Sequence, residues 1–291
     1  MITTMKNIKY YLQKAKKEKW ALGQFNFSDV SQLKGIVAAA QNFKSPVIIG
    51  TSEGESKFVG LEEAVALKKV LVKKTGVPIF LNLDHGKSFE HIQAAILAGY
   101  DMVHFDGSKL SLDENIKITK KIIVLARKKG VVVEGEVGRF GTAASKVYQE
   151  KFEIKEEDLT NPIEAEKYAE KTKVDLLAVS VGTFHGVDAT GISPSIKLQL
   201  LKDITGKIKL PMVLHGGSGT PQKDIKEAIS LGITKININT DVRLAFSERL
   251  RKILEIDKEE ITPYKYLADP IDAVKKAVEE KLGLFGSQGK A

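Results

Sequence analysis

Eight short apolar runs repeat along this chain, and each is followed by a stretch with helical spacing of its apolar residues. The runs predict strands over residues 21–27, 46–51, 78–84, 102–105, 131–137, 176–181, 212–214 and 235–239. The intervening stretches predict helices over 30–42, 61–74, 89–98, 112–129, 162–172, 195–205, 223–231 and 242–254. Eight strand–helix units in alternation predict an α/β protein with a (β/α)8 TIM-barrel fold.

A doubly wound open sheet is the structural alternative. Such a sheet more often carries a glycine-rich turn after its first strand, and the segment GQFNFSD at residues 23–29 lacks one. The 291 residues, 43% of them hydrophobic, fit a single domain over 1–291, since no linker or low-complexity segment divides the chain. We expect extra helices at both ends: an amphipathic one with Ile8, Leu12 and Ala15 on one face, and another over 270–282.

The composition excludes several classes of protein. No apolar stretch has transmembrane length and the first residues lack the apolar run of a signal peptide, so we expect a cytoplasmic protein without a membrane partner. The net charge of +8 is spread over lysine-rich helices without interleaved aromatics, so we expect no nucleic-acid partner. With no cysteine in the chain, any metal must be held by histidine or carboxylate side chains.

Polar residues gather where the predicted strands end. In a TIM barrel the active site lies at the C-terminal ends of the strands. A preference for turns would explain asparagine, aspartate and serine there, but not histidine. The residues at these ends are Asn26, Ser52, Asp84, His85, Asp106, Glu134, Glu136, His185, His215, Asn237 and Asn239.

Three of the five histidines, His85, His185 and His215, follow strands three, six and seven. A single histidine is more often a packing residue, but three at matching strand ends favour a metal site. Three imidazoles with an open fourth position are typical of catalytic zinc. We expect His91, on a predicted helix, at the surface, and His104, in mid-strand, packed behind the barrel.

Carboxylates accompany these histidines. Asp84 precedes His85, and it could transfer protons beside a metal or fix the tautomer of an imidazole. Glu134 and Glu136 are spaced by two and therefore share one face of the fifth strand. Together with Asp106 they could form a second metal site, or they could pair with a lysine or arginine inside the barrel.

The stretch from 211 to 240 combines a histidine with a glycine-rich turn. A buried strand ends at His215, the turn Gly-Gly-Ser-Gly follows, and Thr220 and Pro221 predict a helix start with proline at the first helical position. Backbone N–H groups after strands six to eight could bind a phosphate. The residues concerned are Gly186, Gly216, Ser218, Asn237, Asn239 and Thr240.

Six ordered segments carry a family resemblance: LNLDHG (81–86), HFDGS (104–108), VEGEVG (133–138), VGTFHG (181–186), LHGGSG (214–219) and KININTD (235–241). They resemble the class II, metal-dependent ketose-bisphosphate aldolases, which include the fructose-bisphosphate and tagatose-bisphosphate aldolases. The resemblance runs from FNF at 25–27 to the C-terminal helices, which is nearly the whole chain.

The resemblance implies a role for each matching residue. His85, His185 and His215 would hold the catalytic Zn²⁺, Asp84 would be the proton donor to the aldehyde oxygen, and Asp106 and Glu136 would match a second metal position. It also implies a monovalent cation (Na⁺ or K⁺) near the turns at 186 and 216, and a homodimer or homotetramer. Substrate-binding positions would be Asn26, Ser52, Gly186, Gly216, Gly217, Ser218, Asn237, Ile238, Asn239 and Thr240.

The reaction implied by the resemblance is the zinc-dependent, reversible cleavage of a ketose 1,6-bisphosphate, with fructose 1,6-bisphosphate as the first expectation. The products would be dihydroxyacetone phosphate and glyceraldehyde 3-phosphate, formed through an enediolate that the metal stabilises. One departure concerns the loop after strand five, where Ala144 replaces the family's proton-abstracting glutamate. Glu150, Glu153 or Asp84 could take its place.

Two other functions stay open because of Ala144. The chain could be a tagatose-bisphosphate or other phosphorylated-ketose aldolase or lyase, or a non-catalytic barrel that binds a sugar phosphate. Asp84 argues against the binding-only function, since binding alone needs no proton donor.

Overall fold

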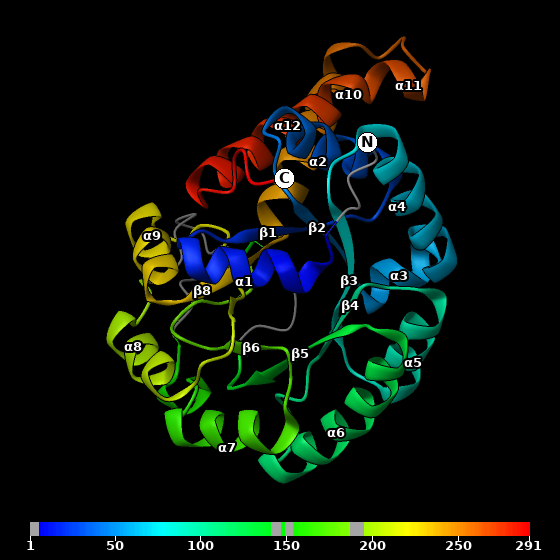
Figure 1. Cartoon of the computed structure of the whole chain (residues 1–291). Helices are drawn as coiled ribbons and strands as arrows, with labels where there is room; N and C mark the ends of the chain where they lie inside the picture. The colour runs from blue at the N-terminus through cyan, green and yellow to red at the C-terminus, as the bar shows by residue number, and fades with distance from the viewer. Residues whose placement is uncertain (1–5, 141–146, 149–153, 187–194) are drawn as a thin grey trace.

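The chain forms a closed barrel of eight parallel strands in sequential order, as Figure 1 shows. The computed structural model describes residues 6–140, 147–148, 154–186 and 195–291. The closed barrel confirms the predicted TIM-barrel fold and excludes the open sheet. The strands are β1 (Leu22–Asn26), β2 (Val47–Ser52), β3 (Ile79–Gly86), β4 (Met102–Phe105), β5 (Val132–Val137), β6 (Leu176–Val179), β7 (Met212–Leu214) and β8 (Ile233–Ile238).

Helices surround the barrel, and those between strands agree closely with the predicted ones. They are α2 (Val30–Asn42), α4 (Leu61–Thr75), α5 (Phe89–Ala98), α6 (Leu112–Lys129), α7 (Pro162–Thr172), α8 (Leu198–Lys207), α9 (Gln222–Leu231) and α10 (Thr240–Ile256). Pro221 is the N-cap of α9 and not its first helical residue, so that prediction was one residue early. The short helix α3 (Glu53–Val59) and the 3-10 turn η1 (Glu156–Asp158) were not predicted.

Side chains inside the barrel change from apolar to polar along the strands. The N-terminal end is filled by an apolar cluster that takes residues from β1 to β7, among them Leu22, Ile48, Phe80, Met102 and Val132. Because residues two apart share a face of a strand, Asn82 and then Asp84 lie above Phe80 on β3. This gradient leaves the C-terminal end of the barrel as the polar end.

The helix α1 (Ile8–Glu18) covers the apolar end, as Figure 1 shows. Its buried face consists of Ile8, Tyr11, Leu12 and Ala15, and the ring of Tyr11 lies 5.7 Å from that of Phe80. Asn7 caps the helix by accepting the backbone N–H of Tyr10. The predicted amphipathic helix is therefore confirmed, and its function is to seal the barrel opposite the polar end.

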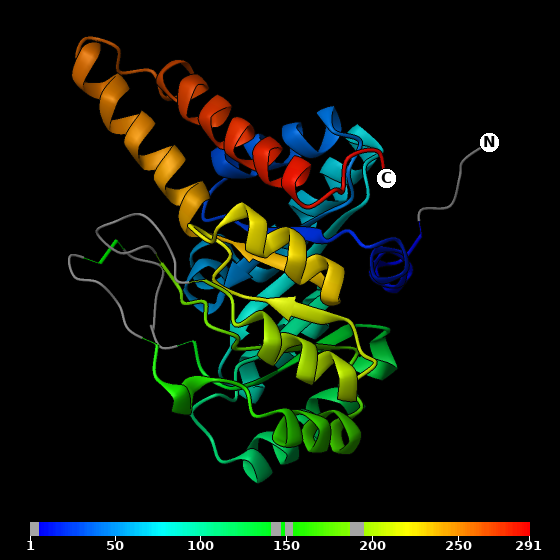
Figure 2. The same ribbon diagram turned by 90° about the vertical axis from the view of Figure 1, so that its left-hand side faces the viewer.

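At the other end of the chain, α10, α11 (Pro263–Tyr266) and α12 (Ala268–Leu284) form a helical extension that projects from the barrel in Figure 2. α12 then returns along α2 and buries Val274, Val278 and Leu282. This confirms the predicted C-terminal helix.

No helix in the described part of the chain is long and apolar enough to cross a membrane.

Candidate active site

A cavity of about 820 Å³ opens at the C-terminal ends of the strands. Among the predicted site residues, Asn26, Gly217 and Ile238 do not line it: Asn26 lies directly behind Asp84, and Gly217 and Ile238 lie in the turn and strand beneath. The predicted residues that line it are Ser52, Asp84, His85, Asp106, Glu136, His185, Gly186, His215, Gly216, Ser218, Asn237, Asn239 and Thr240. Barrel closure thus brings together side chains that are far apart in the sequence.

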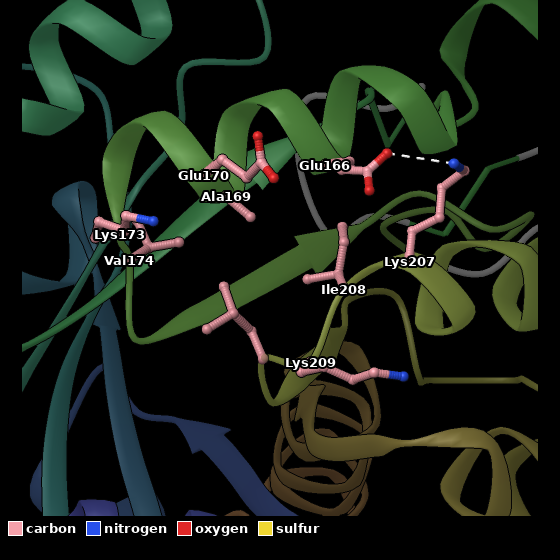
Figure 3. Close-up of a pocket in the computed structure, with 9 residues that line it drawn as sticks. Glu166, Ala169, Glu170, Lys173, Val174, Lys207, Ile208 and Lys209 are labelled. Carbon is pink, nitrogen blue, oxygen red and sulfur yellow. Dashed lines mark hydrogen bonds and ion pairs between the residues drawn. The ribbon is translucent and has the colours of Figure 1, made fainter.

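A smaller hollow of about 390 Å³ lies at the opposite end, where α7 and α8 lead into β6 and β7 (Figure 3). Glu166 and Lys207 form an ion pair across it at 3.2 Å. The remaining lining is mostly aliphatic or consists of lysine side chains. It contains no histidine and lies at the end of the barrel that does not carry chemistry in this fold.

The backbone at His85 explains how two adjacent residues both reach the cavity. His85 has a φ of 52°, in the left-handed region that residues other than glycine rarely adopt. At the same place the pairing of β3 with β4 shifts register between Leu83 and Gly86. The alternation of side chains is therefore broken, and Asp84 and His85 both line the cavity. A strained backbone held in place by its surroundings is common at functional sites.

The carboxylate of Asp84 is held by two amides. Asn26 Nδ2 donates to Asp84 Oδ2 and Asn237 Nδ2 donates to Oδ1, each at 2.9 Å. Burial alone would raise the pKa of Asp84, but the neighbouring imidazoles of His85, His104 and His215 hold it well below its usual range. Asp84 is therefore an ionised, oriented carboxylate at the cavity floor.

Two imidazole nitrogens face each other across the site, His215 Nδ1 and His85 Nε2, at 3.0 Å. The other ring nitrogens are held by carboxylates: His215 Nε2 lies 2.8 Å from Glu134 Oε1, and His85 Nδ1 lies 3.1 Å from Asp106 Oδ2. A carboxylate favours the N–H on the nitrogen that it contacts, which makes the opposite nitrogen the one available to a metal. Burial opposes a charge on His85, but Asp84, Asp106 and Glu136 raise its pKa. Burial lowers the pKa of His215 to about 3, so this ring is neutral at pH 7.

This arrangement fits a divalent metal ion. Two nitrogen ligands on a tetrahedral zinc, each at about 2.0–2.1 Å, would be about 3.3 Å apart, close to the 3.0 Å observed. Candidate ligand atoms within 4.8 Å of one another come from Asp84, His85, His104 and His215, and a second group comes from His85, Asp106 and Glu136. The donors are imidazoles and carboxylates, as a chain without cysteine requires.

His185 joins the other two predicted histidines at the cavity. Its ring centroid lies 4.7 Å from that of His85 and 5.9 Å from that of His215. The three histidines that follow β3, β6 and β7 are therefore brought together, as the sequence predicted.

The prediction for His104 was wrong. The residue lies inside the barrel, fully buried, with its ring centroid 4.5 Å from that of His85. The His85 backbone N–H donates to His104 Nδ1 at 3.1 Å, and His104 Nε2 lies 2.9 Å from Glu136 Oε2. The reason is strand parity: His104 is two residues before Asp106 and so shares its face. The sequence contained that signal.

Glu134 and Glu136 share the interior face of β5 as predicted, but their surroundings differ. Glu134 Oε2 lies 2.8 Å from Lys235 Nζ, so of the two alternatives for these glutamates, the ion pair with a barrel lysine is the one found for Glu134. Burial opposes ionisation of Glu134, yet the charges of Lys235 and His104 hold its pKa below the usual range. Glu136 instead belongs to the second candidate metal group with Asp106, and burial together with Asp106 raises its pKa.

Sequence reasoning missed the network on the β1–β2 side. Ser52 and Glu55 form a capping box at the start of α3, for which the spacing Ser-x-x-Glu was the available signal. Glu55 Oε2 also accepts from Asn26 Nδ2 at 3.1 Å, and Glu55 Oε1 pairs with Arg243 Nη2 at 2.5 Å. His91, expected at the surface, is half-buried on α5 and contacts Ser56 Oγ at 2.8 Å.

A glycine-rich turn and the start of α10 lie where β7 and β8 end. Gly216 has a φ of 68°, and a Cβ there would lie 2.3 Å from the carbonyl oxygen of Phe184, so only glycine fits. Ser218 Oγ accepts the backbone N–H of Asp241 at 3.2 Å, which ties this turn to the start of α10. The Asn239 side chain makes no capping hydrogen bond to α10, and Asn239 and Thr240 line the cavity, so the N-terminus of this helix lies at the cavity.

The loop after β5 lies partly outside the described residues. Ala144, Glu150 and Glu153 all fall there, so the substitute for the family's loop glutamate stays a sequence prediction.

A substitution at Gly50 tests how tightly Asn26, which donates to Asp84, is packed inside the barrel. A Cβ at Gly50 would lie 2.2 Å from Asn26 Oδ1 and 2.8 Å from Gln24 Nε2, inside the barrel. We expect Gly50→Ala to displace Asn26 and to lower the free energy of unfolding by about 1–3 kcal/mol, as overpacking does. Urea denaturation measures this. Gly54→Ala is the matched control, because its Cβ meets nothing within 4 Å; equal stability of the two variants would contradict the role assigned to Gly50.

Comparisons with known proteins give the family of the chain. The family model described as class II fructose-bisphosphate aldolase matches residues 6–290. The chain is 37% identical to a fructose-bisphosphate aldolase of Geobacillus stearothermophilus over 98% of each chain. It is 35% identical to a sulfofructosephosphate aldolase of Alkalicoccus urumqiensis over 97% of each chain. Among solved structures, the YdjI aldolase of Escherichia coli K12 aligns with a TM-score of 0.83 at 30% identity, covering 99% of this chain and 100% of that one.

Proposed function

The chain belongs to the class II fructose-bisphosphate aldolase family, and we propose that it catalyses the zinc-dependent, reversible cleavage of fructose 1,6-bisphosphate. The products would be dihydroxyacetone phosphate and glyceraldehyde 3-phosphate. Its aldolase relatives make it an enzyme of the lyase class. The observation that carries the proposal is the pair of facing nitrogens, His215 Nδ1 and His85 Nε2, beside the oriented carboxylate of Asp84.

We assign the catalytic zinc to His85, His185 and His215, with Asp106 and Glu136 near a second position for the metal. The carboxylate contacts of His85 and His215 support this assignment, because each contact directs the other ring nitrogen to the same space. Bound there, zinc would supply Lewis-acid stabilisation of negative charge on the carbonyl oxygen of the substrate.

Asp84 is assigned the proton transfer at the C4 hydroxyl. In the cleavage direction its carboxylate accepts the hydroxyl proton as the C3–C4 bond breaks, and the electron pair of that bond passes to the dihydroxyacetone half. C3 then takes a proton from the group that replaces the loop glutamate, for which Glu150, Glu153 and Asp84 are the candidates. In condensation these transfers reverse, and Asp84 returns its proton to the aldehyde oxygen. The amides of Asn26 and Asn237 occupy one lone pair of each oxygen and so hold the carboxylate in one orientation. Ser52, at the rim, would contact the aldehyde half.

The phosphate of the dihydroxyacetone half is assigned to the turns after β6, β7 and β8. Backbone N–H groups there and the N-terminus of α10 provide the donors and the dipole that an anion requires. The binding set comprises Gly186, Gly216, Gly217, Ser218, Asn237, Ile238, Asn239 and Thr240. A sodium or potassium ion beside the turns at 186 and 216 is part of the same proposal.

Ser218→Ala tests the phosphate assignment. Ser218 Oγ accepts from Asp241 N and lies at the cavity wall. A hydrogen bond to a charged group contributes about 1.5–3 kcal/mol, so we expect the KM to rise about tenfold or more with a smaller change in kcat. Steady-state kinetics give both values. A loss of kcat at unchanged KM would place the phosphate elsewhere.

The proposed reaction is tested by loading the protein with zinc and measuring cleavage of fructose 1,6-bisphosphate with and without a chelator. We expect turnover that the chelator removes and that added zinc restores. Turnover that persists in chelator after metal analysis shows no bound metal would contradict the zinc dependence.

A different phosphorylated ketose is the second candidate substrate. The specific reason is that a relative named for sulfofructosephosphate matches at 35% identity, almost as well as the fructose-bisphosphate aldolases. A panel of fructose, tagatose and sulfofructose phosphates under the same conditions separates these substrates. Zinc binding without turnover on any of them would favour the binding-only barrel.

We also propose a homo-oligomer and a cytoplasmic location. The helical extension exposes Ile256, Ile261 and Tyr264, each by two thirds or more, which supports contact with a second copy. Light scattering coupled to size exclusion measures the assembly, and a monomer would contradict it.

A further inference from the structure

Lys235 is a fully buried lysine inside the barrel, and it pairs with Glu134 without lining the cavity. It lies on the interior face of β8, one step below Asn237, at the level of the strands where the apolar lining gives way to polar residues. A buried lysine is rare unless its ammonium is fully paired. Its partners are therefore informative.

The ammonium of Lys235 connects the two halves of the site. On one side Nζ donates to Asn237 Oδ1 at 2.7 Å, and Asn237 Nδ2 donates to Asp84 Oδ1 at 2.9 Å. On the other side Nζ lies 2.8 Å from Glu134 Oε2, and Glu134 Oε1 lies 2.8 Å from His215 Nε2. The carboxamide and the carboxylate each have one end held by Lys235 and the other end on a site residue.

Each contact removes an ambiguity. An amide can present either its oxygen or its NH₂ group, and a donor at Oδ1 forces the NH₂ group of Asn237 toward Asp84. A carboxylate paired at Oε2 keeps Oε1 directed at His215, which fixes the proton on Nε2 and leaves Nδ1 as the lone-pair donor. Both fixed orientations are ones that the proposed chemistry requires.

We propose that Lys235 is a positioning residue that orients both the proton-transferring carboxylate of Asp84, through Asn237, and the metal-binding face of His215, through Glu134. The expected effect on kcat, through Asn237 and Asp84, rests on the proposed function. The expected effect on zinc affinity, through Glu134 and His215, does not depend on which substrate the protein uses.

The test compares Lys235→Met with the wild type, using zinc affinity and the visible spectrum of the cobalt-substituted protein. Loss of groups that orient metal ligands typically costs 10–100-fold in metal affinity or activity. We expect Lys235→Met to weaken zinc binding at least tenfold and to shift the cobalt spectrum. Phe80→Ala, at the apolar end of the barrel, is the control: it should lower the melting temperature but leave zinc affinity, spectrum and kcat unchanged.

The variant with Lys235→Met alone leaves Glu134 buried without its cation and could fail to fold. The double variant Lys235→Met/Glu134→Gln removes both charges, and Glu134→Gln alone is its reference. At saturating zinc we expect the kcat of the double variant to lie at least tenfold below that of Glu134→Gln, with KM similar, because only the double variant also loses the support of Asn237. Equal kcat in these two variants would overturn the proposal and reduce Lys235 to a counter-charge for Glu134.

The metal readouts separate a failure of this inference from a failure of the proposed function. The wild type could bind zinc but cleave none of the ketose phosphates. In that case zinc affinity and the cobalt spectrum still test whether Lys235 orients His215 through Glu134. If Lys235→Met kept the zinc affinity and the cobalt spectrum of the wild type, the proposed orientation of His215 by Lys235 would be overturned.

Discussion

Replacing His215 with alanine is expected to remove zinc from the purified protein and to lower kcat/KM for the proposed cleavage by about four orders of magnitude, since Lewis-acid stabilisation by a metal contributes several kcal/mol. The reason is that His215 is neutral, fully buried and presents Nδ1 to His85 Nε2 at 3.0 Å, so its loss removes one of the two facing nitrogens. The substitution also leaves Glu134 without the imidazole at its Oε1. Metal analysis and steady-state kinetics measure the two effects.

His91→Ala is the matched control for this prediction. His91 lies on α5 and contacts Ser56, away from the cluster of imidazoles. We expect wild-type zinc content and nearly wild-type kinetics from this control. Retention of one zinc per chain by His215→Ala, with activity, would place the metal elsewhere.

Asp84→Asn is the second variant with a large expected effect. The substitution keeps the size of the side chain but removes the proton acceptor, so kcat should fall by two to four orders of magnitude. KM and zinc affinity should change much less, because the imidazoles stay in place. Single-turnover kinetics with stoichiometric zinc measure the chemical step directly.

Asp101→Asn controls for the loss of a partly buried carboxylate. Asp101 accepts from the Leu81 backbone N–H and pairs with Lys68 outside the cavity, so its substitution should affect stability and not kcat. If Asp84→Asn kept a tenth or more of the wild-type kcat, proton transfer would have to be assigned to another group.

The fold could be predicted because the sequence repeats the strand and helix patterns of a (β/α)8 barrel. Alternating apolar runs and helical stretches repeat eight times, and once the barrel closes, the ends of the strands must meet. His85, His185 and His215 were therefore expected together, although 130 residues separate His85 from His215. The same logic applied to strand parity would have placed His104 inside the barrel beside Asp106.

Other parts of the site depend on three-dimensional contacts that no local pattern carries. Lys235 reads as one lysine among many in a basic chain, and only closure of β8 against β1 and β7 buries it beside Glu134. Asp84 and His85 both line the cavity because His85 has a left-handed φ and the pairing of β3 with β4 shifts register there. A histidine in this conformation has no sequence signal, since glycine is the residue that usually marks it.

Deuterium exchange into dihydroxyacetone phosphate, followed by NMR in D₂O with the zinc-loaded protein, tests the central claim most directly. The measurement needs no aldehyde, so it reports on the proposed metal and phosphate sites, and on the group that abstracts the carbon proton, whichever ketose is the substrate. Our account predicts uptake of one deuterium per molecule, abolished by a chelator and by His215→Ala. Stoichiometric zinc on the protein with no exchange would contradict the assignment of this site as an aldolase centre.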